Sequence, residues 1–211
     1  MPYGYLGTAP NQIKKNSGVF SVDDINDLEA KNHFGGSMKL ITEINASTAS
    51  SIVLDTIFQD AYDVHLLQLN SILYSANAET PVMRFSNDGG SSYEVGTAYN
   101  YGFQKMAAHD FFGEGRHAGT TGIFEIMGKG GSTAVRKNHS YIYLYNLGDS
   151  SKYSYCTSHN IGSDDAGNSI THWGGGMYTG IETVNAIQIL LTGGATMTGN
   201  IKLYGLKQWV I

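Results

Sequence analysis

The chain has 211 residues and a formal net charge of −5, and its length fits one domain of roughly 100–200 residues, with or without an added arm. Charged residues make up only 15% of it, against about 25% in a typical globular protein. With 13 Lys and Arg in total, it lacks the basic clusters by which nucleic-acid binders neutralise phosphates. Its 27 Gly, 14 Tyr and 3 Pro instead favour many short strands joined by turns.

The sequence shows no targeting or membrane-spanning segment. No apolar run approaches the roughly 18 residues that cross a bilayer, and the first residues, MPYGYLGTAPNQIKK, lack the pattern of a signal peptide. We therefore expect synthesis in a cytoplasm and no membrane insertion. Cys156 is the only cysteine, so it cannot form a disulfide within the chain, and we expect it to be a small buried side chain.

The first 36 residues are predicted to form an arm with one short helix. Gly, Pro and Asn punctuate residues 1–20, where neither strand nor helix periodicity persists. Residues 21–32 have a helical pattern, with Ser21 as the N-cap and Asp24 three residues later, as in a capping box. A helix of about three turns is unstable alone, so we expect residues 1–36 to anchor the protein on a neighbour. The apolar side chains expected to make this contact are Tyr3, Tyr5, Phe20, Ile25 and Leu28.

From residue 37 onward the hydrophobic pattern alternates with a period of two. Ile142 and Leu144 alternate with three Tyr, and Ile187 and Ile189 flank Gln188. Strands with one polar face belong to antiparallel sheets, and many of them without intervening helices form sandwiches or barrels. We therefore predict an all-β fold, an antiparallel jelly-roll-like sandwich over residues 37–211. The predicted strands cover residues 38–45, 50–58, 62–74, 81–87, 92–100, 121–128, 139–146, 153–160, 169–173, 184–192 and 200–209, with crossover links at 102–120 and 161–168.

Residues 86–93, SNDGGSSY, form the sharpest local pattern. Asp88, Gly89 and Gly90 tolerate the backbone angles of a tight turn, so we predict a hairpin between strands that meet here. The string resembles the Asp-box of sialidases, S-x-D-x-G-x-[ST]-[WFY], of which those proteins carry several copies and this chain one. In that family the box is a folding element remote from the active site, so the resemblance implies a turn and no chemistry.

No motif for catalysis or cofactor binding stands out, since G-x-S-x-G, H-E-x-x-H and a complete P-loop are absent. Glu125 and Glu182 are the carboxylates considered for a glycosidase pair, and nothing distinguishes them from other acids. We therefore expect no enzyme, no cofactor and no metal. Two loose groups of metal-ligand types occur, and exposed polar loop residues explain them more simply. One group is His109, Asp110, Glu114 and His117, and the other is His159, Asp164, Asp165 and His172.

The segment HWGGGMY at residues 172–178 places an aromatic ring beside three glycines. A ring on a bare backbone can stack on a sugar or on another subunit, and a Trp buried at a sheet corner is the alternative. The residues selected as possible contacts for a glycan or a subunit are Trp173, Tyr178, His109 and His117.

Several segments, in order along most of the chain, resemble structural proteins from virions of tailed phages of marine bacteria (cyanophage-type). Residues 60–65, DAYDVH, are similar to a "YDVY" strand, and residues 86–93 to their "STDGGSSY" hairpin. Residues 143–153, YLYNLGDSSKY, resemble "YLYNLGNSSKY", and residues 199–205, GNIKLYG, resemble "GTIKLYG". The segment from Gly18 through the helix to Gly35-Gly36-Ser37 is similar to their N-terminal anchor.

This resemblance implies a virion structural protein, most simply a tail-fibre or tail-associated protein. An arm at 1–36 would dock on other virion proteins, and a sandwich at 37–211 would contact a host surface glycan through residues 102–120 and 161–180. Phage appendages are commonly homotrimers, which would bury faces such as Tyr141, Tyr143 and Tyr145. A capsid decoration or head-fibre protein is the alternative that the sequence does not separate, and a virion-associated glycan hydrolase is a further one.

Overall fold

The computed structural model describes residues 22–23, 26, 38–55, 62–109 and 111–206. By its contacts the chain divides into Met1–Ser37 and Met38–Ile211. In the first unit, Val22, Asp23 and Asn26 are helical and exposed. The rest of the predicted helix lies outside the described residues, as do the proposed anchor residues Tyr3, Tyr5, Phe20, Ile25 and Leu28. The second unit contains every strand described below.

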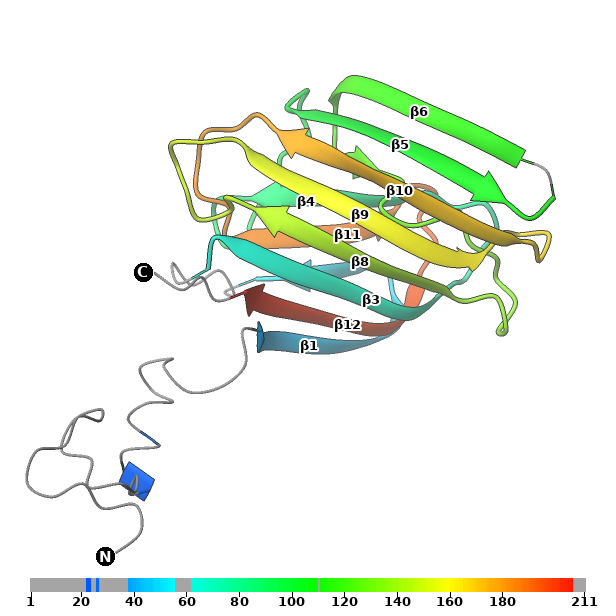
Figure 1. Ribbon diagram of the computed structural model, residues 1–211, viewed down its shortest axis with the longest axis horizontal. Helices are drawn as coiled ribbons and strands as arrows, with labels where there is room; N and C mark the ends of the chain where they lie inside the picture. The colour runs from blue at the N-terminus through cyan, green and yellow to red at the C-terminus, as the bar shows by residue number, and fades with distance from the viewer. Residues whose placement is uncertain (1–21, 24–25, 27–37, 56–61, 110, 207–211) are drawn as a thin grey trace, which may run out of the picture. The chain divides into compact units, whose positions relative to one another are not determined.

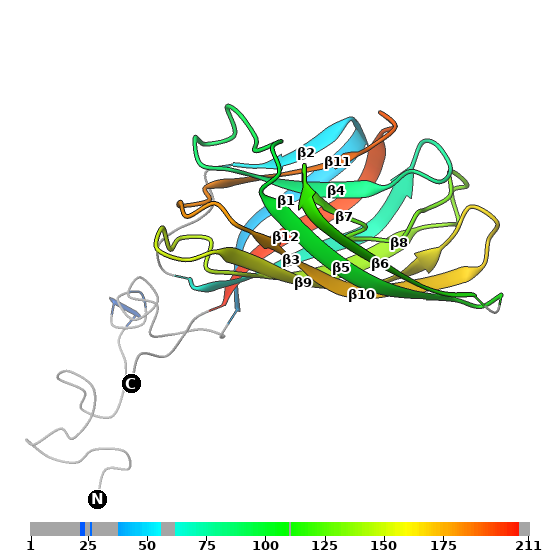
Figure 2. The same ribbon diagram turned by 90° about the horizontal axis from the view of Figure 1, so that it is seen from above.

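The second unit is an all-β, antiparallel sandwich, which confirms the predicted fold class (Figure 1). Its strands form an eight-stranded sheet in the order β1-β12-β3-β8-β9-β10-β5-β6 and a four-stranded sheet in the order β2-β11-β4-β7. Figure 2 shows the two sheets as separate layers. The strands are β1 (Met38–Ala49), β2 (Ser51–Leu54), β3 (Val64–Tyr74), β4 (Pro81–Ser86), β5 (Tyr99–Ala107), β6 (Phe111–Thr120), β7 (Ile123–Phe124), β8 (Asn138–Tyr145), β9 (Ser154–Ser163), β10 (Ser169–Tyr178), β11 (Ala186–Leu191) and β12 (Met197–Leu206).

Eight of the strands have the nested pairing of a jelly roll. β1 pairs with β12, β2 with β11, β3 with β8, and β4 with β7, all antiparallel. This is the pattern of one long hairpin rolled into two sheets. We call these eight the rolled strands. The other four form two inserted hairpins, β5–β6 between β4 and β7, and β9–β10 between β8 and β11, and both extend the same sheet.

The core lies between the sheets and follows the predicted alternation. On β8, Ile142 and Leu144 are fully buried, whereas the neighbouring Tyr141 is exposed. Ile187 and Ile189 are also fully buried, and Gln188 is half-buried. Burial of each such side chain stabilises the fold by roughly 1.5–3 kcal/mol relative to exposure. Alternating burial therefore fixes which face of each rolled strand turns inward.

An aromatic cluster joins the inserted hairpins to the rolled strands. The ring centroid of Tyr99 on β5 lies 5.0 Å from that of Tyr178 on β10 and 6.0 Å from that of Phe85 on β4. The Tyr99 hydroxyl accepts a hydrogen bond from the backbone N–H of Phe85, with an N–O distance of 2.8 Å. Both sheets therefore contribute to this contact, which holds the two hairpins in place.

The inserted hairpins are where the predicted strands were wrong. The predicted strand at 92–100 is a loop until β5 begins at Tyr99, and the predicted link at 102–120 is the β5–β6 hairpin itself. Of the predicted strand at 121–128, only Ile123–Phe124 is extended. Residues 161–168 are likewise the end of β9 and a short turn, with Gly167 at φ 96°. Glycines such as Gly102 and Gly115 suggested loops, but the ladder bonds of long paired strands outweigh the weak strand preference of glycine.

The Asp-box segment is a closed loop and not the predicted hairpin. β4 before it and β5 after it lie in different sheets. The Asp88 carboxylate accepts hydrogen bonds from the hydroxyls of Ser86 and Ser92, at 2.7 and 2.6 Å, and from the Ser92 backbone N–H at 2.9 Å. Gly89 and Gly90 have φ of 74° and 87°, in the region that favours glycine. These hydrogen bonds lower the pKa of Asp88 to about 2, so its carboxylate is charged at neutral pH.

Candidate functional site

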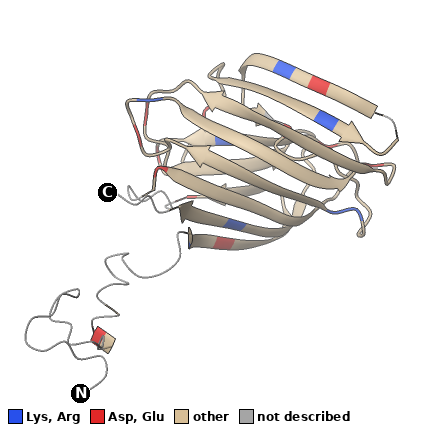
Figure 3. Ribbon diagram, in the orientation of Figure 1, with Lys and Arg blue, Asp and Glu red and all other residues tan. Residues whose placement is uncertain are grey.

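The outer face of the eight-stranded sheet, turned away from the core, is the broadest exposed feature of the sandwich. Residues alternate between faces along a strand, so the buried side chains of His172 and Tyr178 place Trp173 and Met177 on the outer face of β10. The same alternation places Tyr155 on the outer face of β9, where it is 41% exposed. The central strands β3, β8, β9 and β10 contain no Asp, Glu, Lys or Arg, as Figure 3 shows.

In the inserted hairpins, glycines leave part of this outer face without side chains. Gly175 on β10 and Gly102 on β5 are paired in register, and the next outer residue on β6 is Arg116. A Cβ added at Gly102 would have only the Gly115 carbonyl oxygen within 4 Å, at 3.5 Å, so space above this glycine is open. Bare backbone therefore forms the floor between the larger side chains around it.

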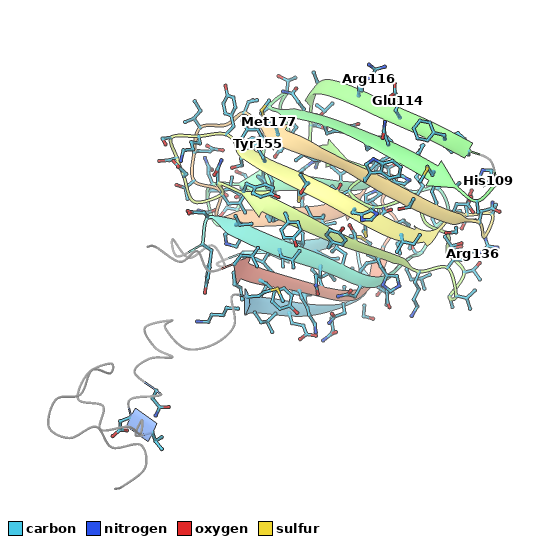
Figure 4. The ribbon with its side chains drawn as sticks, in the orientation of Figure 1. His109, Glu114, Arg116, Arg136, Tyr155 and Met177 are labelled. Carbon is cyan, nitrogen blue, oxygen red and sulfur yellow. The ribbon has the colours of Figure 1, made fainter. Side chains whose placement is uncertain are left out.

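Two adjoining hollows lie on this floor. The larger is about 570 Å³ and is bounded by Tyr155, Met177, Asn100 and Arg116. The smaller is about 290 Å³ and is bounded by Trp173, with Gln104, Glu114 and Arg116. Arg116 borders both hollows, and we call the two together the glycine groove. Figure 4 shows Tyr155 and Met177 on β9 and β10, and Glu114 and Arg116 across the sheet on β6.

The polar groups of the glycine groove are held by one another. The Trp173 indole N–H donates to the Gln104 side-chain oxygen at 3.1 Å. The Arg116 guanidinium donates to the Glu114 carboxylate at 2.6 Å, although both side chains are largely exposed. The Asn100 side-chain oxygen accepts from the Gly119 backbone N–H at 2.9 Å. The groove therefore presents two rings, an amide-rich wall and an ion pair whose charges cancel.

The opposite, inner face of the inserted hairpins carries a buried ionisable group of residues. Glu125, just after β7, has a φ of 52°, and its carboxylate lies 3.5 Å from the ring of His172 and 3.8 Å from the Lys105 ammonium. Among the described residues neither ring nitrogen of His172 has a hydrogen-bond partner. Burial, together with the nearby charges of Lys105 and Lys129, lowers the pKa of His172 to about 4. His172 is therefore neutral at pH 7, and this cluster faces the interior and not the glycine groove.

Of the contact residues chosen from sequence, Trp173 lies in the glycine groove and is half-buried in mid-sheet, not at a corner. Tyr178 is 2% exposed and belongs to the core, where its hydroxyl donates to Glu182, so it contacts no surface ligand. His117 is exposed on β6, stacks on Tyr101 with ring centroids 4.9 Å apart, and borders the larger hollow. His109 is exposed at the far end of β5 and lies outside both hollows (Figure 4).

The two predicted His and acid groups do not assemble into metal sites. On β6, Glu114 and His117 fall on opposite faces of the strand, and His159 and His172 do the same on β9 and β10. One contact crosses between the groups, from the His109 ring to the Asp164 carboxylate at 3.8 Å. Asp110 lies outside the described residues. No group of three or more His, Cys, Asp or Glu that could hold a metal occurs in the described part of the chain.

The two carboxylates considered for glycoside hydrolysis lie in different surroundings. Glu125 is enclosed by Lys105 and His172, as described above. Glu182 lines a separate hollow of about 340 Å³ beside the Asp-box loop and accepts hydrogen bonds from Tyr178 and Asn87. Cys156 is buried on the inner face as predicted, and burial raises the pKa of its thiol to about 12.

The ranges expected to contact a glycan, 102–120 and 161–180, contain most residues of the glycine groove, but their strand structure was missed. Gly102, Gln104, Glu114 and Arg116 were assigned to a loop, and Tyr155 was not selected at all. The available signal was the alternation of Gly113 and Gly115 with Glu114 and Arg116, a period of two that is typical of a strand.

Within the described residues no helix is long and apolar enough to cross a membrane. Comparisons with protein-family models, with curated proteins and with solved structures find no match to this chain.

Proposed function

We propose that this chain is a structural protein of a tailed-phage virion that presents the outer face of its eight-stranded sheet for attachment to a host surface. The glycine groove is the observation that carries the attachment role. It combines two aromatic rings, open backbone and polar side chains on a sheet face whose strands β9 and β10 carry no charged residue. Binding sites are typically apolar depressions with a few placed polar groups.

The virion context rests on the ordered resemblance of residues 60–65, 86–93, 143–153 and 199–205 to phage structural proteins. An antiparallel sandwich of low charge is compatible with a rigid outward domain. The arm at 1–36 is assigned to docking on other virion proteins, and a homotrimer is the expected assembly.

The experiment that tests this role is localisation of the chain in purified particles by cryo-electron microscopy, combined with binding of the full chain to host cells. A few symmetric copies on the tail, and saturable cell binding, are the expected results. Copies spread over the shell lattice would make the chain a decoration protein instead. Absence from particles would refute the virion role.

The docking role of the arm has its own test. Deletion of residues 1–36 is expected to leave a folded, soluble sandwich that no longer incorporates into particles, because the strands of the sandwich all lie in Met38–Leu206. Circular dichroism checks the fold, and immunoblotting of purified particles checks incorporation. Normal incorporation of the truncated chain would show that the arm is not the anchor.

A further inference from the structure

We infer that the glycine groove binds an uncharged oligosaccharide that runs along the strands, with one sugar ring in each of its two hollows. This inference rests on the proposed attachment function and names the ligand class of the same site. It depends on three properties of the groove, namely its charge, its floor and the placement of its rings.

The charge of the groove favours a neutral ligand. Arg116 is the one cationic side chain that lines the two hollows, and the Glu114 carboxylate lies 2.6 Å from its guanidinium. The neighbouring strands β9 and β10 have no charged residue, and the Lys105 side chain on β5 faces the interior beside Glu125. A site for sialic or uronic acid would need a cation whose charge is not already matched, because carboxylates are bound by charge-assisted pairs. The groove offers no such excess charge.

The floor of the groove suits a flat, extended ligand. Because Gly175 and Gly102 are paired in register, no side chain stands between Thr157 on β9 and Arg116 on β6. The hollows of about 570 and 290 Å³ share Arg116 and follow one another along β10 and β5, the first at residues 175–177 and 100–101 and the second at 173–174 and 102–104, so a ligand that fills both must run along the strands. A chain of sugar rings can lie on this face, whereas a peptide strand bound through backbone hydrogen bonds would pair with the edge strand β6, beside the sheet and not on its face.

The side chains of the groove match the two surfaces of a sugar. The C–H face of a pyranose packs on aromatic rings, and Trp173 borders one hollow while Tyr155 borders the other. Hydroxyl groups donate and accept, and they pair with planar amide and carboxylate groups. The bond from Trp173 occupies the carbonyl of Gln104, so the amide NH2 of Gln104 remains the group that can donate to a hydroxyl. This bond also fixes the orientation of the indole before any ligand arrives.

The test is titration of the full-length protein with neutral gluco-, galacto- and manno-oligosaccharides of two to four units, and with matched oligosaccharides that contain sialic or uronic acid. Binding is followed by calorimetry and by saturation-transfer NMR. We expect at least one neutral series to bind, and affinity to rise by about 10-fold or more from one ring to two as the second hollow is filled.

Three variants locate the site. Trp173→Ala is expected to weaken neutral binding by about 10-fold or more, since it removes one stacking surface. Gly102→Val places a side chain on the open floor, where only the Gly115 carbonyl lies nearby, and is expected to abolish binding while the fold stays intact. Phe112→Ala is the matched control, because this ring is 61% exposed on the outer face of β6 and lines neither hollow. Its affinity should equal that of the parent protein.

A fourth variant tests the charge argument. Glu114→Gln leaves the Arg116 guanidinium without its carboxylate, so acidic oligosaccharides are expected to gain affinity relative to neutral ones. Preference of the parent protein for acidic oligosaccharides would overturn the inference, as would unchanged neutral binding in both Trp173→Ala and Gly102→Val. If the full chain binds host cells but no saccharide of either class, the ligand inference fails while the attachment role stands. If the full chain binds neither host cells nor any saccharide, the attachment role is rejected as well.

Discussion

The inserted hairpins share the eight-stranded sheet with four of the rolled strands, but the two regions bury different side chains. On the inner face of β3, β8 and β12 most buried residues are aliphatic, beside His65, Asn138 and Ser140. The strands β9 and β10 bury Ile170 and Tyr178 together with the polar or small side chains of Ser154, Cys156, Asn160 and His172. Polar buried groups contribute little net stability compared with aliphatic ones. The rolled strands therefore supply most of the stabilising core, and the hairpins depend on their backbone ladders. A groove built on such added strands can vary without loss of the scaffold.

The largest expected effect separates the two regions by stability. Leu144→Ala on the rolled strand β8 removes a fully buried side chain and is expected to lower the free energy of unfolding by about 2–5 kcal/mol. Ile170→Ala on the inserted strand β10, where the side chain is 8% exposed, is expected to cost less. Urea unfolding of both variants gives the comparison. Equal losses of unfolding free energy in the two variants would show that the hairpins belong to the same cooperative core. The rolled strands and the inserted hairpins would then not differ in stability.

Acid stability is the next largest effect and involves one buried His in each region. Burial is the main cause that lowers the pKa of His65 on β3, and the pKa of His172 on β10, to about 4. Lys105 and Lys129 lower the His172 pKa further, whereas Asp63 acts in the opposite direction on His65. Because the unfolded state takes up the proton first, stability is fully present above pH 6.5. It falls as the pH drops to about 4, by roughly 3 kcal/mol per His.

The measurement is urea unfolding of His65→Phe and His172→Phe across this pH range. Each variant is expected to remove about half of the acid-induced loss, whatever its effect at pH 7. The slope with pH is the readout, so a general destabilisation does not affect the test. If His172→Phe leaves the slope unchanged, then the inner face of the hairpins is open to water.

The smallest expected effect concerns the loop between the rolled strand β4 and the inserted strand β5. Asp88→Ala removes the carboxylate that accepts from Ser86 and Ser92, so the backbone amide of Ser92 is expected to exchange its hydrogen faster. Global stability should change less than in the two preceding cases. Ser91→Ala is the control, because its hydroxyl donates to the Asp88 carbonyl and not to the carboxylate. Equal exchange in the two variants would show that the carboxylate does not order this loop.

The same contrast explains what the sequence could predict. Alternation of apolar and polar residues identified β8, β11 and β12, because each has one face in an aliphatic core. β5, β6 and the end of β10 lack that signal, because positions 102, 115 and 175 are glycines. A glycine has no side chain whose apolar or polar character would indicate which face of the strand is buried. Trp173 was found from its ring and its glycine neighbours. Arg116 and Tyr155 were not, because their proximity depends on the register of four strands.

The nested pairing also determines when the domain can fold. Met38 at the start of β1 pairs with Leu206 at the end of β12, so the outermost pair joins the two ends of the sandwich. During synthesis this pair cannot form until Leu206 has left the ribosome, and contacts of such long range form slowly. The β5–β6 and β9–β10 hairpins need only local contacts. The nascent chain therefore carries paired hairpins, with one edge of the sheet still open, before the first strand finds its partner.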